Sequence, residues 1–343
     1  MNEDLKLARW MNPRTVSFLM MAGLLLLAPA LHLTTPLLTI LLSTFALRKF
    51  NFWGKRPLSV VIFVCAVCLI SIGFFVFTRN AARALPRVAE ESIPKVIQLA
   101  NERNIELPFD DVSSLETLAK KELSERFGEL TNFAKFATKE LVVVILGLVI
   151  AVSIFLNPTL DIDPSMHPVK NNLYTAYCAE FAHRFRNFYQ SFATVMGAQI
   201  VISSINTVFT AIFIFSVSMK HPLVLIGVTF LCGLLPIIGN ILSNCVIVAV
   251  GFTMSPTMAI AALAFLVLLH KFEYFLNSKI IGDRIRNPVW LTMIGLIIGE
   301  KIMGIPGMIL APVILYYLKL ELGQITAPAP SPAEAKPSAP LAA

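Results

Sequence analysis

Long apolar runs, separated by short polar stretches, follow one another along most of the chain. The first run extends from Val16 to Leu47, which is too long for one membrane-spanning helix, since about 20 apolar residues suffice to cross a bilayer. Pro29 and Pro36 bracket a polar patch inside this run, so the pattern predicts two short helices joined there. A third span is predicted over Leu58–Phe77.

Residues 79–138 form the one large hydrophilic stretch. Ser113 and Glu116 make a capping box, and the apolar residues that follow recur near helical spacing. This predicts an amphipathic helix that leads into a fourth span at Glu140–Leu156. We expect the insert to be extracytoplasmic and to form a helical cap on the membrane domain or on a neighbouring subunit. A regulatory or binding domain is the alternative.

An aromatic stripe marks the start of the second half of the chain. Apolar and aromatic residues recur every three or four positions over residues 169–192, and Arg184 and Arg186 lie on the other face. The pattern predicts a helix along the cytoplasmic leaflet that then turns into a fifth span, Val195–Val217. Interfacial anchoring by the two arginines is favoured over a cofactor or nucleic-acid role. A further full span is predicted over Met258–Leu276.

Two apolar blocks are interrupted by glycine and proline. The block Val224–Phe252 contains Gly233, Pro236, Gly239 and Asn240 near its middle. The second block, Val289–Tyr317, is interrupted by GEKIMGIPG at residues 299–307. Proline removes a backbone donor, and backbone groups freed at membrane depth have to be buried in protein or line a cavity. Such places bind cargo in transporters.

The charges between these two blocks distinguish two topologies. The loop 277–288 contains Lys279, Arg284 and Arg286 against the single acidic residue Asp283. If both blocks cross the membrane fully, this basic loop lies outside, against the positive-inside rule. If each block enters and returns as a re-entrant hairpin, the loop is cytoplasmic. We favour the hairpins over kinked spans; both topologies leave the C terminus inside, and the basic N-terminal residues indicate a cytoplasmic N terminus.

The predicted fold class is an all-α polytopic membrane protein with about eight membrane segments, two of them broken, re-entrant hairpins. A helical hydrophilic insert separates the third and fourth spans. The expected domains are N-terminal membrane helices at 1–78, the insert at 79–138, a C-terminal membrane core at 139–322 with an amphipathic helix at 169–192 and broken segments at 224–252 and 289–317, and a disordered Pro/Ala tail at 323–343.

Composition supports an integral membrane protein. Of the 343 residues, 56% are hydrophobic and 14% are charged, which is more apolar surface than a soluble domain hides. The net charge of +7 is interpreted through the positive-inside rule, not as nucleic-acid binding. Four of the five cysteines fall in apolar segments, and Cys65 and Cys68 form a C-x-x-C that is typical of two thiols on one helix face. An uncleaved first helix is favoured over a signal peptide.

Polar residues in the apolar half are the candidates for transport. Glu273 lies at the end of the sixth full span and Glu300 lies in the second break, and each either pairs with a neighbouring cation or couples transport to an ion. No P-loop or H-E-x-x-H motif is found, so we expect no enzyme, cofactor or metal site. The residues proposed for the transport path are Gln199, Pro236, Gly239, Asn240, Asn244, Gly304, Pro306 and Gly307.

The second half resembles the autoinducer-2 exporter (AI-2E) family of bacterial membrane proteins. The resemblance extends from about Phe181 to Leu320. Its motifs are MGAQ at 196–199, HPLVLIGVTFLCGLLPIIGN at 221–240, EYFLNSKIIGDRI from residue 273, Pro288, and IGEKIMGIPGMILAP at 298–312. The sequence departs from the family pattern at Ala198, inside the usual Gly-Gln pair, and at Ser278, where proline is common.

This resemblance implies a bacterial inner-membrane transporter without ATPase machinery. It implies either export of a small polar signal molecule of the autoinducer-2 type or exchange of Na⁺ (or Li⁺) for H⁺. The alternative is a membrane scaffold that recruits partners through the hydrophilic insert. The expected partners are the lipid bilayer, a small polar solute or Na⁺ and H⁺, and no nucleic acid. A homo-oligomer, with a pentamer as the working number, is also expected.

Overall fold

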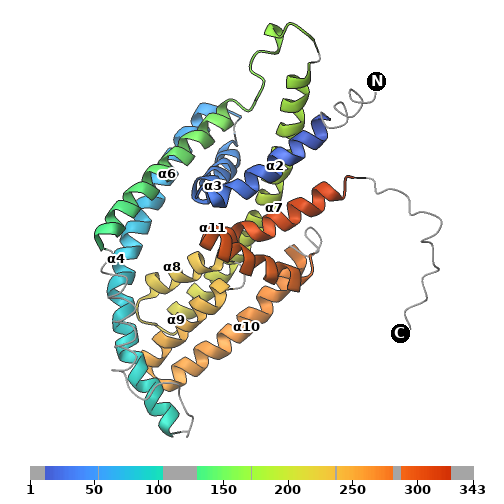
Figure 1. Ribbon diagram of the computed structural model, residues 1–343. Coiled ribbons are helices and arrows are strands. Elements are labelled where there is room, and N and C mark those ends of the chain that lie inside the picture. Colours follow the sequence, from blue (N-terminus) through green and yellow to red (C-terminus); the bar gives the residue numbers. More distant parts are fainter. Residues whose placement is uncertain are drawn as a thin grey trace, which may run out of the picture.

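The computed structural model describes residues 12–52, 54–102, 130–170, 172–235, 238–280 and 287–325. Within these ranges all regular structure is helical, and no strand occurs (Figure 1). The all-α fold class is therefore confirmed. The helices are α2 (Pro13–Ala30), α3 (Thr34–Phe50), α4 (Arg56–Glu102), α6 (Leu130–Leu156), the short 3₁₀ helix η1 (Pro164–Met166), α7 (Leu173–Ser216), α8 (Pro222–Gly233), α9 (Ile238–Met254), α10 (Pro256–Ile280) and α11 (Val289–Leu322).

Five segments of the described helices have the length and apolar composition needed to cross a membrane. Their outward faces carry large apolar side chains, such as Leu26, Leu69 and Leu268, each at least 70% exposed. Such surfaces are stable against lipid and not against water. The five segments are Pro13–Ala30, Arg56–Ala84, Leu173–Ser216, Pro256–Glu273 and Trp290–Leu322, and shorter apolar helices cover Glu140–Leu156, Pro222–Gly233 and Gly239–Met254.

The first apolar run forms the two short helices that the sequence predicts. Asn12 caps α2 by accepting a hydrogen bond from the Arg14 backbone N–H at 3.1 Å, and Pro13 occupies the first helical position, where no donor is needed. The chain leaves α2 at Ala30 and begins α3 at Thr34. The separation into two helices is confirmed.

The helix α4 continues well beyond the third span. It runs without interruption from Arg56 to Glu102, although Pro86 and Pro94 lie inside it. A proline within a helix costs about 3 kcal/mol, so other contacts have to hold the helix together. These come from α8 and α9, which pack along the second half of α4. The third span and the first part of the insert are thus one helix.

The helix α7 differs from the sequence interpretation. An amphipathic helix at 169–192 was expected to lie on the membrane and then turn into a separate span, and this is wrong: α7 is a single helix of 44 residues. No proline lies within α7 to end it, and the helix continues through Gly197. Its aromatic stripe is also buried in protein, since Phe188 and Phe192 are fully covered.

Two hydrophobic clusters lie along α7 and share it as their common element. The first cluster joins α2, α3, the first half of α7 and α11, through residues that include Met21, Leu41, Phe192 and Val313. The second joins the end of α4, the last part of α7, and α8, α9 and α10. In Figure 1 α7 runs between these two groups of helices. The middle of α7, near Gln199, therefore lies between the two clusters.

Candidate functional site

The break between α8 and α9 brings two helix ends into backbone contact. The helix α8 ends at Gly233 and α9 begins at Ile238, while Pro236 lies outside the described residues. A Cβ atom placed on Gly239 would lie 1.6 Å from the Cys232 carbonyl oxygen. Only glycine permits this approach. The break predicted over Gly233–Asn240 is therefore present, and it is closed by backbone packing.

The outer ends of α8 and α9 lie side by side on α4. Lys220, just before α8, donates a hydrogen bond from Nζ to Glu91 Oε2 at 2.9 Å. Lys95 donates from Nζ to the Thr253 carbonyl, near the end of α9, at 2.5 Å. Glu91 and Lys95 are about one helical turn apart. The two helices therefore leave α4 and return to it at the same level.

Three polar side chains that the sequence singled out meet at the inner end of this helix pair. Asn240 donates a hydrogen bond from Nδ2 to Glu273 Oε1 at 2.5 Å. Gln199 donates from Nε2 to the Gly233 carbonyl at 2.6 Å, so it satisfies a carbonyl at the end of α8. Gln199 is 34 positions from Gly233 in the sequence, and Asn240 is 33 positions from Glu273. The fold thereby brings distant residues to one place. We refer to Gln199, Gly239, Asn240 and Glu273 as the break site.

Glu273 is buried, with 8% of its surface exposed. Its other oxygen, Oε2, lies 3.7 Å from His270 Nδ1, and His270 itself is largely exposed. Lys271 and Lys279 are the lysines nearest to Glu273 in the sequence. In the structure Lys271 is exposed, and the side chain of Lys279 lies outside the described residues. Glu273 thus has an amide donor on one carboxylate oxygen and an imidazole near the other.

A row of buried polar side chains continues from the break site along α7. Ser203 donates its hydroxyl hydrogen to the Phe230 carbonyl at 2.8 Å. Asn206 Oδ1 and Thr210 Oγ1 are buried and have no hydrogen-bond partner within the described residues. Buried polar atoms of this kind commonly bind water or an ion. Asn244, also proposed for the path, is half-buried on α9 and forms no hydrogen bond with other described residues.

The break in α11 is a sharp reversal at Gly304. This residue has φ 63° and ψ −147°, a conformation that only glycine adopts readily. The arms on either side pack together, because a Cβ on Gly307 would lie 1.9 Å from the Gly299 carbonyl oxygen. A Cβ on Gly295 would touch Leu315 at 2.9 Å, so the arms run antiparallel. The break predicted at 299–307 is therefore present.

The charged residues of the α11 break are placed differently from Glu273. Glu300 and Lys301 are both exposed, and neither forms an ion pair with another described residue. Pro306 is half-buried, while Gly307 is buried against Gly299. The structure thus gives this break close glycine packing but no polar cluster within its described part.

The two breaks are related through α7. Met303, the residue before the α11 reversal, packs against the cluster that contains Val195 and Met196. Gln199, which bonds to the end of α8, lies about one turn further along α7. The helix α11 otherwise packs chiefly on α7 and α3. Both breaks therefore have contacts with helices or clusters to which α7 contributes.

A buried ion pair that the sequence analysis did not anticipate ties three helices together. Arg184 on α7 donates from Nη1 to Glu321 Oε2 near the end of α11, from Nε to Ser17 Oγ at 2.8 Å, and from Nη2 to the Arg14 carbonyl at 3.1 Å. Asn187 donates to Glu321 Oε1 at 2.9 Å. Arg184 thus binds protein and does not anchor the helix in lipid. The sequence signal for this pair was an acidic residue at the end of an apolar block, Glu321, together with an arginine beside an aromatic stripe, Arg184. Charges in such places usually need a partner.

A metal site in a protein needs several ligating side chains in one place. Within the described ranges no three His, Cys, Asp or Glu side chains lie together as metal ligands would. Cys65 and Cys68 are both exposed free thiols on α4, as two positions on an apolar helix can be. The groups at the break site are a carboxylate, two amides and backbone carbonyls, with the His270 imidazole beside them.

Comparison with known proteins agrees with this architecture. A family described as AI-2E family transporter matches residues 11–326. A relative in Bacillus subtilis (strain 168), named "Putative transport protein YdbI", is 21% identical over 276 residues, which cover 78% of this chain and 76% of the relative. The family match spans nearly the whole sequence, including both breaks and the buried Glu273. This chain is a multi-pass membrane protein that belongs to the AI-2E transporter family.

Proposed function

We propose that the protein exchanges Na⁺ or Li⁺ for H⁺ across the bacterial inner membrane, and that Glu273 carries the coupling. The observation that supports this most directly is the contact between Asn240 and the buried Glu273 carboxylate at the end of a broken helix pair. Burying a carboxylate in an apolar bundle costs free energy, so such residues commonly have a functional role. Exchange of a proton for a cation at this carboxylate is the simplest such role.

The surroundings of Glu273 fit alternate occupation by a proton and a cation. When it is ionised, the Asn240 amide stabilises the carboxylate as a donor, and the amide oxygen, which has no partner among the described residues, can face a cation. When Glu273 is protonated, the pair still forms a neutral hydrogen bond. His270 lies 3.7 Å away and is exposed, so it can pass a proton between Glu273 and water. The polar row from Gln199 to Thr210 offers oxygen atoms further along the same route.

The proposal includes the re-entrant topology. The contacts of Lys220 with Glu91 and of Lys95 with Thr253 support it, because they hold the start of α8 and the end of α9 at the same level of α4. If the α8–α9 pair crossed the membrane fully, these two ends would lie on opposite sides. In this topology the insert, the start of α8 and the end of α9 face the outside. The N and C termini and the loop 277–288 are cytoplasmic.

Cysteine labelling tests the topology. In a background without the natural cysteines, Lys220→Cys and Thr257→Cys lie just outside the two ends of the α8–α9 pair, and both side chains are exposed. A membrane-impermeant maleimide is expected to label both in intact cells. Labelling of only one of them would mean that the α8–α9 pair crosses the membrane. Ser278→Cys should be labelled only after the cells are opened.

Export of a small polar signal molecule of the autoinducer-2 type is the second candidate. It is favoured by the uncharged amides of Gln199, Asn240 and Asn244, which suit a solute rich in hydroxyl groups. The family description also points in this direction. The ion gradient would then drive the solute through the same break site, so Glu273 would remain the coupling residue.

Flux in proteoliposomes tests both candidates. Purified protein in vesicles that contain a pH-sensitive dye is expected to release protons when external Na⁺ or Li⁺ is added, and K⁺ is expected to have little effect. Glu273→Gln should lower this flux at least about a hundredfold, since it removes the only titratable oxygen pair in the proposed site. Wild-type flux no higher than that of empty vesicles, with either the ions or a furanosyl signal as cargo, would overturn the transport proposal.

A further inference from the structure

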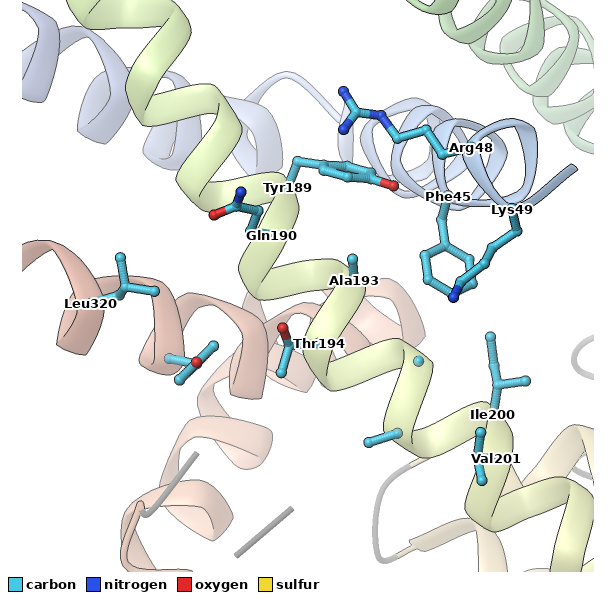
Figure 2. A pocket seen from close by; sticks show the side chains of 13 residues that line it. Phe45, Arg48, Lys49, Tyr189, Gln190, Ala193, Thr194, Ile200, Val201 and Leu320 are labelled. Atoms are coloured by element: carbon cyan, nitrogen blue, oxygen red, sulfur yellow. The ribbon is translucent and has the colours of Figure 1, made fainter. Parts of the chain in front are cut away.

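A pocket of about 860 Å³ lies between α3, α7 and the end of α11, away from the break site. Figure 2 shows its lining, with Arg48 and Lys49 projecting from α3 and with Tyr189, Gln190 and Thr194 projecting from α7. A volume of this size is typical of small-molecule sites.

The lining of the pocket is basic and aromatic. The Arg48 guanidinium lies 4.5 Å from the centre of the Tyr189 ring, and Lys49 Nζ lies 5.8 Å from the centre of the Phe45 ring. No acidic side chain is among the lining residues, and neither cation forms an ion pair with a described carboxylate. The rings orient the two cations without neutralising them. The pocket therefore presents two positive charges to a ligand.

Helix geometry separates this pocket from the break site. Each residue of an α-helix is rotated by about 100° from the previous one. Gly197 and Val201 line the pocket, and Gln199, two residues from each, is therefore rotated by about 200° and lies on the far side of α7. Gln199 bonds to the end of α8 on that side. The pocket and the break site thus occupy opposite faces of one helix.

The pocket lies where the chain leaves its apolar segments. Arg48 and Lys49 occupy the last turn of α3. The connection that follows contains Lys55 and a Phe52 side chain that is 78% exposed, and Arg56 begins α4. Two tyrosines, Tyr189 and Tyr316, line the pocket. Tyrosines and basic residues are enriched at the level of lipid head groups. A pocket that combines an apolar lining with two positive charges suits the head group of an anionic lipid.

We propose that this pocket binds a phosphate group, supplied by the head group of an anionic membrane phospholipid. Arg48 offers the planar donor set that matches phosphate oxygens, and Lys49 adds a second positive charge. Gln190 and Thr194 contribute neutral donors from α7. The apolar part of the lining, which includes Ile200 and Val201, accommodates the start of an acyl chain. A soluble phosphate ester would share this chemistry and is distinguished by experiment.

Native mass spectrometry of the purified full-length protein tests the proposal. Equal amounts of dioleoylphosphatidylglycerol and dioleoylphosphatidylcholine are added, and the ratio of the bound lipids is measured. The wild type is expected to prefer phosphatidylglycerol. The double variant Arg48→Gln/Lys49→Gln should reduce this preference about thirtyfold, because each basic side chain at a membrane surface contributes roughly fivefold.

The matched control removes two positive charges outside the pocket. Lys55→Gln/Lys170→Gln changes exposed side chains at the same expected membrane face, so it should retain the preference for phosphatidylglycerol. An equal loss in both double variants would overturn the proposal, because it would show attraction to surface charge in general. Unchanged thermal unfolding of the variants in detergent shows that the fold is intact.

A third arm identifies the source of the phosphate group. Glycerol 3-phosphate is added alone to the wild type and to the Arg48→Gln/Lys49→Gln variant. Binding to the wild type only, without a preference among lipids, supports the phosphate site with a soluble ester as its ligand. If neither probe binds the wild type better than the double variant, the proposal is wrong.

Discussion

The α8–α9 break and the α11 break both bring helix backbones together at glycine, but their surroundings differ. At the first, Gly239 packs against the Cys232 carbonyl, and side chains from α7 and α10 supply an amide and a carboxylate. At the second, Gly307 packs against Gly299, and the nearby Glu300 is exposed. Polar side chains surround the α8–α9 break, whereas the described part of the α11 break shows only close packing of two helix arms.

This difference shows where the chemistry of a broken helix comes from. Glycine and proline determine that the backbone can turn and that two arms can approach closely. They supply no ionisable group. Glu273 is 33 residues from Asn240 and reaches the first break only because α10 packs beside α9. The neighbours of a break, and not its own residues, therefore determine whether it can bind an ion.

The largest effect is expected from Gly239→Ala. The added methyl carbon would lie 1.6 Å from the Cys232 carbonyl oxygen, so α8 and α9 would have to separate. Overlap of backbone and side chain of this kind destabilises by more than about 3 kcal/mol. We expect a lower yield of folded protein, a lower thermal midpoint in detergent and no transport. Gly73→Ala is the matched control, because nothing lies within 4 Å of its new Cβ, and it should be neutral or stabilising.

A smaller effect is expected from Gly304→Ala. Nothing lies within 4 Å of a Cβ at this position, so only the backbone conformation is affected. The strain of φ 63° with ψ −147° for an L-residue is about 1–3 kcal/mol. The thermal midpoint should fall by less than in Gly239→Ala. Gly304→Asn should not restore it, because asparagine tolerates positive φ only with ψ near +45°. Full stability of either variant would mean that α11 has another conformation.

Much of this architecture could be predicted from local sequence. Pro29 and Pro36 predicted the separation of α2 from α3, and clusters of glycine and proline predicted both breaks. The same reasoning failed for α7, where amphipathic periodicity over 169–192 was interpreted as a helix on the membrane surface. A stripe of phenylalanines has the same spacing whether lipid or protein covers it. Only the packing of α2, α3 and α11 on that stripe distinguishes the two cases.

The candidate site could be predicted only in part. Gln199, Asn240 and Glu273 were identified because polar groups in apolar helices are rare, but their mutual contacts depend on tertiary packing. The pair of Arg184 with Glu321 was missed, since 137 residues separate the partners and no local pattern connects them. Pro236 lies outside the described residues, and its role in the path stays a prediction.

A still smaller effect is expected from Glu300→Gln, which sharpens the contrast between the breaks. The sequence alone offered Glu300 as well as Glu273 as a coupling residue. In the structure its side chain is exposed and has no partner within the described residues, so neutralising it removes no interaction seen there. Proton-coupled Na⁺ flux should stay within about twofold of the wild type, compared with the loss of about a hundredfold or more expected for Glu273→Gln. A larger loss in Glu300→Gln than in Glu273→Gln would reverse the assignment of the two breaks.

The smallest effect is expected at the outer end of the α8–α9 pair. The hydrogen bond and positive charge of Lys220 lower the pKa of Glu91 below its ordinary value of 4.5. A carboxyl group whose pKa is lowered by folding stabilises the folded state above its unfolded pKa, and this contribution is lost as the pH falls through the folded value. The difference in thermal midpoint between the wild type and Glu91→Gln should therefore be small at pH 7 and vanish below the lowered pKa. In a Lys220→Gln background, where the hydrogen-bond donor is already absent, Glu91→Gln should show a smaller pH-dependent difference. An equal difference in both backgrounds would mean that the contact between Lys220 and Glu91 contributes nothing to stability.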